Sequence, residues 1–213
     1  NQDDSRRLQA ELLNKTEELI QEHVQVYSVA EPLPLYPIDR NIADVIAQDK
    51  IGERVKVINL QRSLNAYIER NIERAPYLAS ISDEVERVIE QLHQRQISVQ
   101  SALEQLQARA AEAAAFSEER AASSLDDLAF ALRISLGAAK SLAPSDAQQA
   151  DELVGDIAAY LQEHTGWTHN ENLERQVRLE LYRRLLPRMQ KPVNPQQANA
   201  IVNDLLRMHR ITL

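Results

Sequence analysis

Two runs of apolar residues near the middle of the chain constrain its fold most strongly. Within each run the apolar positions are spaced alternately by three and four residues, which places them along one side of an α-helix. The first run consists of Leu78, Ile81, Val85, Val88 and Leu92, and the second of Val99, Leu103, Leu106, Ala110 and Ala113. The pattern predicts an antiparallel helical hairpin in which the two apolar sides face each other. Ser98 is a suitable N-cap for the second arm, which would extend to about Arg120 over roughly 35 Å at 1.5 Å per residue.

The rest of the sequence also favours helices and contains no convincing strand pattern. Further helices are expected at about residues 5–24, 39–48, 55–72, 124–137, 145–161, 172–186 and 194–206. Ser124 and Asp127 resemble a capping box at the start of one of them, and Asn194 followed by Pro195 predicts the start of the last. We therefore predict an all-α fold, a multi-helix bundle that contains the long antiparallel hairpin.

Three prolines within residues 31–37 interrupt the helical pattern, because proline lacks a backbone donor and fixes φ. This segment predicts an extended connector packed as a loop, and the alternative is a ligand for a polyproline-binding groove. The chain then divides into residues 1–50, which hold an N-terminal helix, the connector and a short helix, and residues 51–213, a C-terminal helical domain. We expect the two parts to pack as one compact unit.

Composition narrows the possible function classes. The 213 residues are 44% hydrophobic but only 4% aromatic, so aliphatic and alanine side chains must form the core. The four glycines are isolated, and none precedes the Lys-Ser/Thr pair of a phosphate-binding loop. The absence of cysteine excludes thiolate zinc sites and cysteine nucleophiles, and it is typical of the reducing cytoplasm. We therefore predict a cytoplasmic protein with no catalytic residue and no cofactor of its own.

The start of the chain and its hydropathy bear on targeting. No run of about 18 apolar residues occurs, and the first four residues are polar. We therefore expect neither a membrane span nor a signal peptide. A chain that begins with Asn1 rather than methionine suggests a fragment or a processed product.

Two groups of titratable residues are candidates for chemistry, and a structural interpretation is favoured for both. His164 and His169 lie close to Glu163, but a metal site would require further ligands at fixed offsets. A helix C-terminus followed by a polar turn is the simpler explanation. The carboxylates within residues 84–90 are expected to form a solvated face, because the sequence shows no pocket that would perturb their pKa values.

The C-terminal part of the chain differs in charge from the rest. Residues 170–213 contain eight basic and four acidic residues, a net charge of +4, so the remainder carries −12 of a total of −8. This asymmetry is an argument about partners rather than about fold. The basic tail could contact the backbone phosphates of DNA.

The predicted helix at residues 172–186 carries the candidate interface. Its apolar residues spread over about two thirds of the circumference, and Glu174, Arg175 and Arg178 fall within that arc. Charges on a burying face must be paired or must meet a partner. Glu174 and Arg178 are four residues apart, so a structural ion pair is the favoured interpretation. Alternatively, Arg175 or Arg178 reaches a partner subunit or a nucleic-acid phosphate. The complete set of candidate interface residues is Arg175, Arg178, Arg183 and Arg184.

Several segments, in this order and spacing, resemble a known family. They are VKVINL (55–60), APYLASI (75–81), RQIS (95–98), ALEQL (102–106), LDDLAF (125–130), Trp167, ERQVR (174–178) and LY (181–182). The chain resembles the C-terminal helical region of the restriction (R, motor) subunit of type I restriction-modification enzymes. The resemblance covers about residues 5–186, and the last helix matches less clearly.

The resemblance implies a role within a larger enzyme. The family's R subunit joins a nuclease domain and two RecA-like helicase domains to this helical region, and the complete enzyme uses ATP and Mg²⁺ to translocate and cleave DNA. None of the nuclease or ATPase motifs lies in this chain, so the resemblance implies no catalytic residue here. It implies an assembly module that docks the motor subunit on the modification and specificity subunits of the methyltransferase core, beside the subunit's own helicase domains. The alternatives are a module that contacts the DNA backbone through the basic tail and a self-associating helical scaffold unrelated to restriction.

Overall fold

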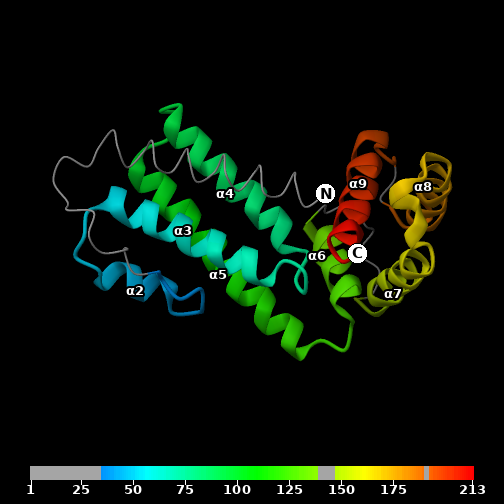
Figure 1. Cartoon of the computed structure of the whole chain (residues 1–213), viewed down its shortest axis with the longest axis horizontal. Coiled ribbons are helices and arrows are strands. Elements are labelled where there is room, and N and C mark those ends of the chain that lie inside the picture. Colours follow the sequence, from blue (N-terminus) through cyan, green and yellow to red (C-terminus); the bar gives the residue numbers. More distant parts are fainter. Residues whose placement is uncertain (1–34, 139–146, 190–191) are drawn as a thin grey trace.

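The computed structural model describes residues 35–138, 147–189 and 192–213 (Figure 1). Their α-helices are α2 (Ile42–Gln48), α3 (Glu53–Asn71), α4 (Leu78–His93), α5 (Val99–Ala122), α6 (Asp127–Ala138), α7 (Ala147–Glu163), α8 (Glu171–Leu185) and α9 (Pro195–Ile211), with 3₁₀ turns η1 (Thr165–His169) and η2 (Leu186–Arg188). No β-strand occurs within these three ranges, so the prediction of an all-α fold is confirmed. None of the described helices combines the length and the apolar character needed to cross a membrane. The helix predicted at residues 5–24 and the first part of the proline-rich connector lie outside the described residues.

Helices α2 to α5 form one group, at the left of Figure 1. Helix α3 contacts α4 and α5, α2 contacts α5, and α4 packs against α5. Ser98 is the N-cap of α5, as predicted, and its hydroxyl accepts the backbone N–H of Ser101 at 3.1 Å. The predicted apolar positions are buried except near the turn, where Leu92 and Val99 are only partly covered. Ala110 and Ala113 are fully buried, and their small side chains let neighbouring helices approach closely.

A Schellman motif ends α4. The backbone N–H of Gln96 donates to the carbonyl of Gln91 at 2.8 Å, and the N–H of Arg95 donates to the carbonyl of Leu92 at 3.0 Å. Arg95 takes the left-handed conformation that this motif requires, with φ of 56°. Glycine is the usual residue here, because the left-handed conformation costs other residues about 1–2 kcal/mol.

The residues that precede α3 are hydrogen-bonded onto it. The backbone N–H of Tyr36 donates to the hydroxyl of Ser63 at 2.8 Å, and that hydroxyl donates to the carbonyl of Asn59 at 2.7 Å. The hydroxyl of Tyr36 donates to Oδ2 of Asp49 at 2.6 Å. Burial, together with this carboxylate, raises the pKa of Tyr36 to about 12. Buried polar groups of α3 thus hold the described end of the connector in the core.

Helices α6 to α9 form a second group, at the right of Figure 1. Helix α6 contacts α7 and α9, and α8 contacts both α7 and α9 from the outside of the group. The capping box predicted at Ser124 is wrong. Asp126 caps α6 instead: its Oδ1 accepts the backbone N–H of Ala129 at 2.7 Å, and its carbonyl accepts that of Phe130 at 2.9 Å. A carboxylate at this position also interacts favourably with the helix dipole.

The two groups share one continuous core. Tyr77, at the start of α4, contacts Phe116 of α5 and Phe130 of α6 edge-on, with ring centroids 5.6 Å apart in both pairs. These are the only two phenylalanines in the chain, so Tyr77 gathers them into one cluster. Burial raises the pKa of Tyr77 to about 12. Nearby, Arg207 of α9 forms an ion pair with Asp83 of α4.

Candidate protein-binding face on helix α8

Helix α8 begins at a side-chain cap and lies on the outside of the second group (Figure 1). The side-chain oxygen of Asn170 accepts the backbone N–H groups of Asn172 at 3.0 Å and Leu173 at 3.2 Å. This cap satisfies donors that the first turn leaves free and fixes where the helix starts. Helix α8 therefore begins at a defined residue.

The buried side of α8 is narrower than the arc predicted from the sequence. Val177, Leu181 and Leu185 are buried in the core. Three other leucines remain exposed: Leu173 by 39%, Leu179 by 65% and Leu186 by 38%. Within the described ranges, α7 and α9 pack on the side of α8 that holds the three buried residues, and the apolar residues on its other sides are exposed. Leu179 is the most exposed large apolar side chain in the described part of the chain.

Arg178 fastens α8 to α9. Its guanidinium pairs with the carboxylate of Glu174 at 2.8 Å and donates to Oδ1 of Asn203 at 2.6 Å. One turn further on, the hydroxyl of Tyr182 donates to Oδ1 of Asn199 at 2.8 Å. Arg178 thus has partners within the chain and serves the packing of α8, which fits a structural ion pair better than an open interface.

Arg184 fastens α8 to α7 in a similar way. Its Nε donates to Glu180 at 3.1 Å, and its Nη1 donates to the carbonyl of Asp156 at 3.3 Å. The guanidinium also lies over the ring of Tyr160, 4.9 Å from the centroid, which is a cation–π contact. Burial raises the pKa of Tyr160.

The other two candidate arginines face outward. Arg175 is exposed and makes no hydrogen bond or ion pair within the described residues. Arg183 contacts Glu180 at 3.2 Å, but its side chain is 82% exposed, so this pair adds little. Leu179 lies between them, four residues from each. We call Arg175, Leu179, Arg183 and Leu186 the α8 outer stripe. Sequence periodicity could place these residues on one side of a helix, but it could not tell which side is covered.

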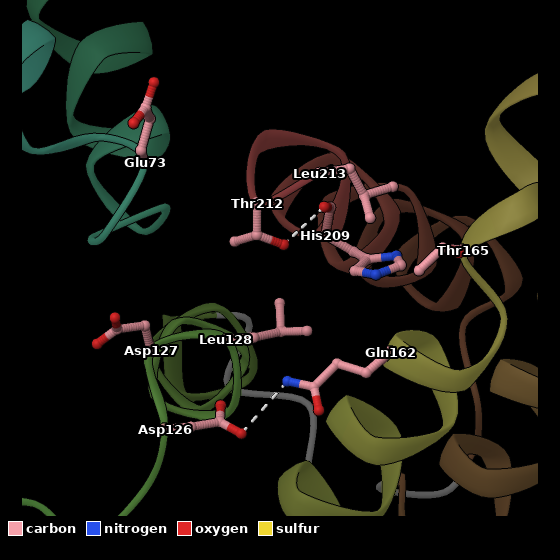
Figure 2. A pocket seen from close by; sticks show the side chains of 9 residues that line it. All are labelled: Glu73, Asp126, Asp127, Leu128, Gln162, Thr165, His209, Thr212 and Leu213. Carbon is pink, nitrogen blue, oxygen red and sulfur yellow. Dashed lines mark hydrogen bonds between the residues drawn. The ribbon is translucent and has the colours of Figure 1, made fainter.

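An open pocket of about 350 Å³ lies where α6, α7, α9 and the segment after α3 meet (Figure 2). Three of its polar side chains already have structural roles. Asp126 caps α6 and accepts a long hydrogen bond of 3.4 Å from Gln162, and Asp127 pairs with Arg120 at 2.8 Å. Figure 2 shows the carboxylate of Glu73 apart from the other lining groups. Among the lining residues, no nucleophilic side chain is hydrogen-bonded to a basic side chain.

His209 lies against this pocket and is buried. Its Nδ1 accepts the indole N–H of Trp167 at 3.1 Å. The guanidinium of Arg210 lies over the Trp167 ring, 5.0 Å from its centroid. Burial lowers the pKa of His209, because the charged imidazolium loses its hydration there. Local sequence spacing could not predict this pair, because the contact joins η1 to α9.

The residues considered for metal binding lie elsewhere. A ring nitrogen of His164 is hydrogen-bonded to the carbonyl of Tyr160 at 2.8 Å, and His169 ends η1 in an exposed position. Within the described ranges, no three or more carboxylate or imidazole side chains are grouped so that they could hold a metal ion. Among the carboxylates at residues 84–90, that of Glu84 pairs with Arg109 of α5.

Comparison with models of protein families, with curated proteins and with solved structures found no match to this chain.

Proposed function

We propose that this chain is an assembly module of the R subunit of a type I restriction-modification enzyme, and that it docks the motor subunit on the methyltransferase core. The observation that carries the proposal is the α8 outer stripe, which combines two exposed leucines with two outward-facing arginines. Exposed apolar side chains beside arginine are typical of protein interfaces. The segments quoted above that resemble the R subunit supply the identity of the proposed partners.

The proposal assigns chemistry to other parts of the enzyme. ATP and Mg²⁺ would serve the helicase and nuclease domains, and this chain would have no catalytic residue. Asp126 and Asp127, which line the pocket in Figure 2, are occupied in a helix cap and an ion pair, which supports a structural role for them. The site of action would be the cytoplasm, where restriction enzymes meet incoming DNA.

Binding to the purified methyltransferase core of the same restriction system tests the proposal. We expect the wild-type chain to bind the assembled modification and specificity subunits in titration calorimetry. The variant Arg175→Glu/Arg183→Glu should bind at least about tenfold more weakly, since reversed charges face a complementary surface. The matched control is Arg54→Glu/Arg87→Glu, which makes the same charge change at two exposed arginines of α3 and α4. A folded wild-type chain that does not bind the core would contradict the proposal.

The two alternatives give different results in the same series. A DNA-contacting module would bind a nonspecific duplex without the core, with an affinity that falls steeply as salt increases. A self-associating scaffold would sediment as a dimer or larger species at micromolar concentration. We expect neither result from the wild-type chain.

A further inference from the structure

We propose that the surface that binds α8 is itself a helix, with two carboxylates about two turns apart and an apolar residue between them. This inference rests on the proposed function, because it specifies the partner at the same face. It is argued from the geometry of the α8 outer stripe, the exposure of its leucines and the unused hydrogen-bonding capacity of its arginines.

The stripe has a regular geometry. Residues four apart on an α-helix differ by about 40° around the axis and about 6 Å along it. Arg175, Leu179 and Arg183 therefore lie along one side of α8, with the two arginines about 12 Å apart and the leucine midway. Leu186 falls within the same sector, about 20° from Arg175. The stripe thus alternates arginine and leucine over three turns.

The arginines of the stripe have guanidinium N–H groups that donate no hydrogen bond within the described residues. Arg175 makes no polar contact within the described residues, and Arg183 makes one with Glu180 in solvent. A guanidinium presents its N–H groups as a planar fork that matches the two oxygens of a carboxylate. Two such carboxylates about 12 Å apart, on either side of an apolar residue, correspond to positions i and i+8 of a second helix with the apolar residue at i+4.

The leucines disfavour a phosphate backbone or a lipid surface as the occupant. Leu179 is 65% exposed at the centre of the stripe, where phosphates would leave it unburied. Three carboxylates on α8 (Glu171, Glu174 and Glu180) leave the helix a net charge of only +1 beside its four arginines. Membrane binding scales with the apolar area inserted, and the stripe offers only two partly exposed leucines. A protein helix satisfies both residue types at once.

Site-specific photo-cross-linking identifies what covers the stripe. The variant Leu179→p-benzoylphenylalanine of the full chain would be irradiated with the purified methyltransferase core, and the cross-linked peptide identified by mass spectrometry. We expect the cross-link within a helical segment that has Asp or Glu close to four residues before and four residues after it. A cross-linked segment without such carboxylates would overturn the inference, and so would a cross-link only to DNA.

Affinities separate this inference from the proposed function. We expect Leu179→Asp and Arg175→Glu/Arg183→Glu each to weaken binding to the core at least about tenfold, because both disrupt the centre of the contact. The control Arg54→Glu/Arg87→Glu should remain within about twofold of the wild type. If the wild type binds but neither α8 variant loses affinity, the inference fails and docking through another face stands. If the folded wild type does not bind the core, both fail. Circular dichroism would show that each variant keeps its helices.

Discussion

Trp167 donates its indole N–H to Nδ1 of His209 at 3.1 Å within the core, although 42 residues separate them in the chain. An indole nitrogen can only donate, so Nδ1 must act as the acceptor and carry no proton. The imidazole is therefore neutral, with its proton on Nε2. If Nδ1 were protonated, its N–H would face the indole N–H of Trp167, and the hydrogen bond would be lost. Burial also disfavours the charged imidazolium. This pair links the turn η1 to the last helix and makes their packing depend on the charge of one residue.

The charge of His209 predicts a loss of stability in acid. In the unfolded chain the pKa of His209 returns to about 6.5, whereas burial lowers it in the folded protein. The unfolded state therefore binds more protons below about pH 6.5, and the free energy of unfolding should fall as the pH drops through that range. The slope contributed by one such site is at most about 1.4 kcal/mol per pH unit.

Urea denaturation between about pH 7.5 and pH 5 measures this slope. The variant His209→Gln keeps an acceptor for Trp167 but does not titrate, so its unfolding free energy should depend less on pH. The control His169→Gln, at an exposed position, should keep the wild-type slope. Equal slopes for the wild type and His209→Gln would show that His209 does not cause the acid sensitivity.

Replacement of Arg95 by glycine should stabilise the protein. The left-handed conformation of Arg95 is costly for any residue with a Cβ atom, and glycine adopts it freely. We expect Arg95→Gly to raise the free energy of unfolding by about 0.5–1 kcal/mol, the larger entropy of unfolded glycine offsetting part of the gain. Arg95→Ala keeps the strain and should give no increase. A destabilised glycine variant would show that the side chain of Arg95 matters more than its backbone.

Two substitutions distinguish the cap of α6 seen in the structure from the one predicted from the sequence. Asp126→Ala removes the acceptor for the N–H of Ala129 and should cost about 0.5–2 kcal/mol in thermal or urea unfolding. Ser124→Ala should change stability by less than about 0.5 kcal/mol, because Ser124 is exposed and does not cap the helix. A larger loss of stability in Ser124→Ala than in Asp126→Ala would support the predicted capping box instead.

The ion pair between Asp83 and Arg207 should be weak and sensitive to salt. Both side chains are about 45% exposed, so solvent screens their attraction. A double-mutant cycle with Asp83→Asn and Arg207→Gln should give a coupling energy of about 0.2–1 kcal/mol that decreases as salt is added. A coupling well above this range, unaffected by salt, would mean that the pair is shielded from water in solution.

The sequence predicted helices well because periodic burial is a local signal. The repeating apolar positions of α4 and α5 are buried almost throughout, and Ser98 and Asn194 cap the helices they were expected to start. The capping box predicted at Ser124 was wrong because two acidic residues follow Leu125, and either of them could cap α6. The fold of the backbone before α6 determines that Asp126 is the cap.

The candidate site was less accessible to prediction, because it depends on which side of α8 meets other helices. Leu179 and Leu181 are only two residues apart, yet one is exposed and the other is fully buried. The four candidate arginines likewise differ in their surroundings: two contact neighbouring helices and two face outward. Arg178 meets Asn203 from α9, a partner 25 residues away that no local pattern could reveal, whereas Arg175 faces solvent.

The side-chain contacts of α8 also give it a mechanical connection to the far group of helices. Tension applied to α8 would pass through the bond between Arg178 and Asn203 into α9, and from Arg207 to Asp83 into α4. The two positions on α9, Asn203 and Arg207, are about one turn apart along that helix. A pull on the outermost helix would therefore load α9 first, and it would reach α4 through the exposed pair of Arg207 and Asp83, which is a weak link because solvent screens it.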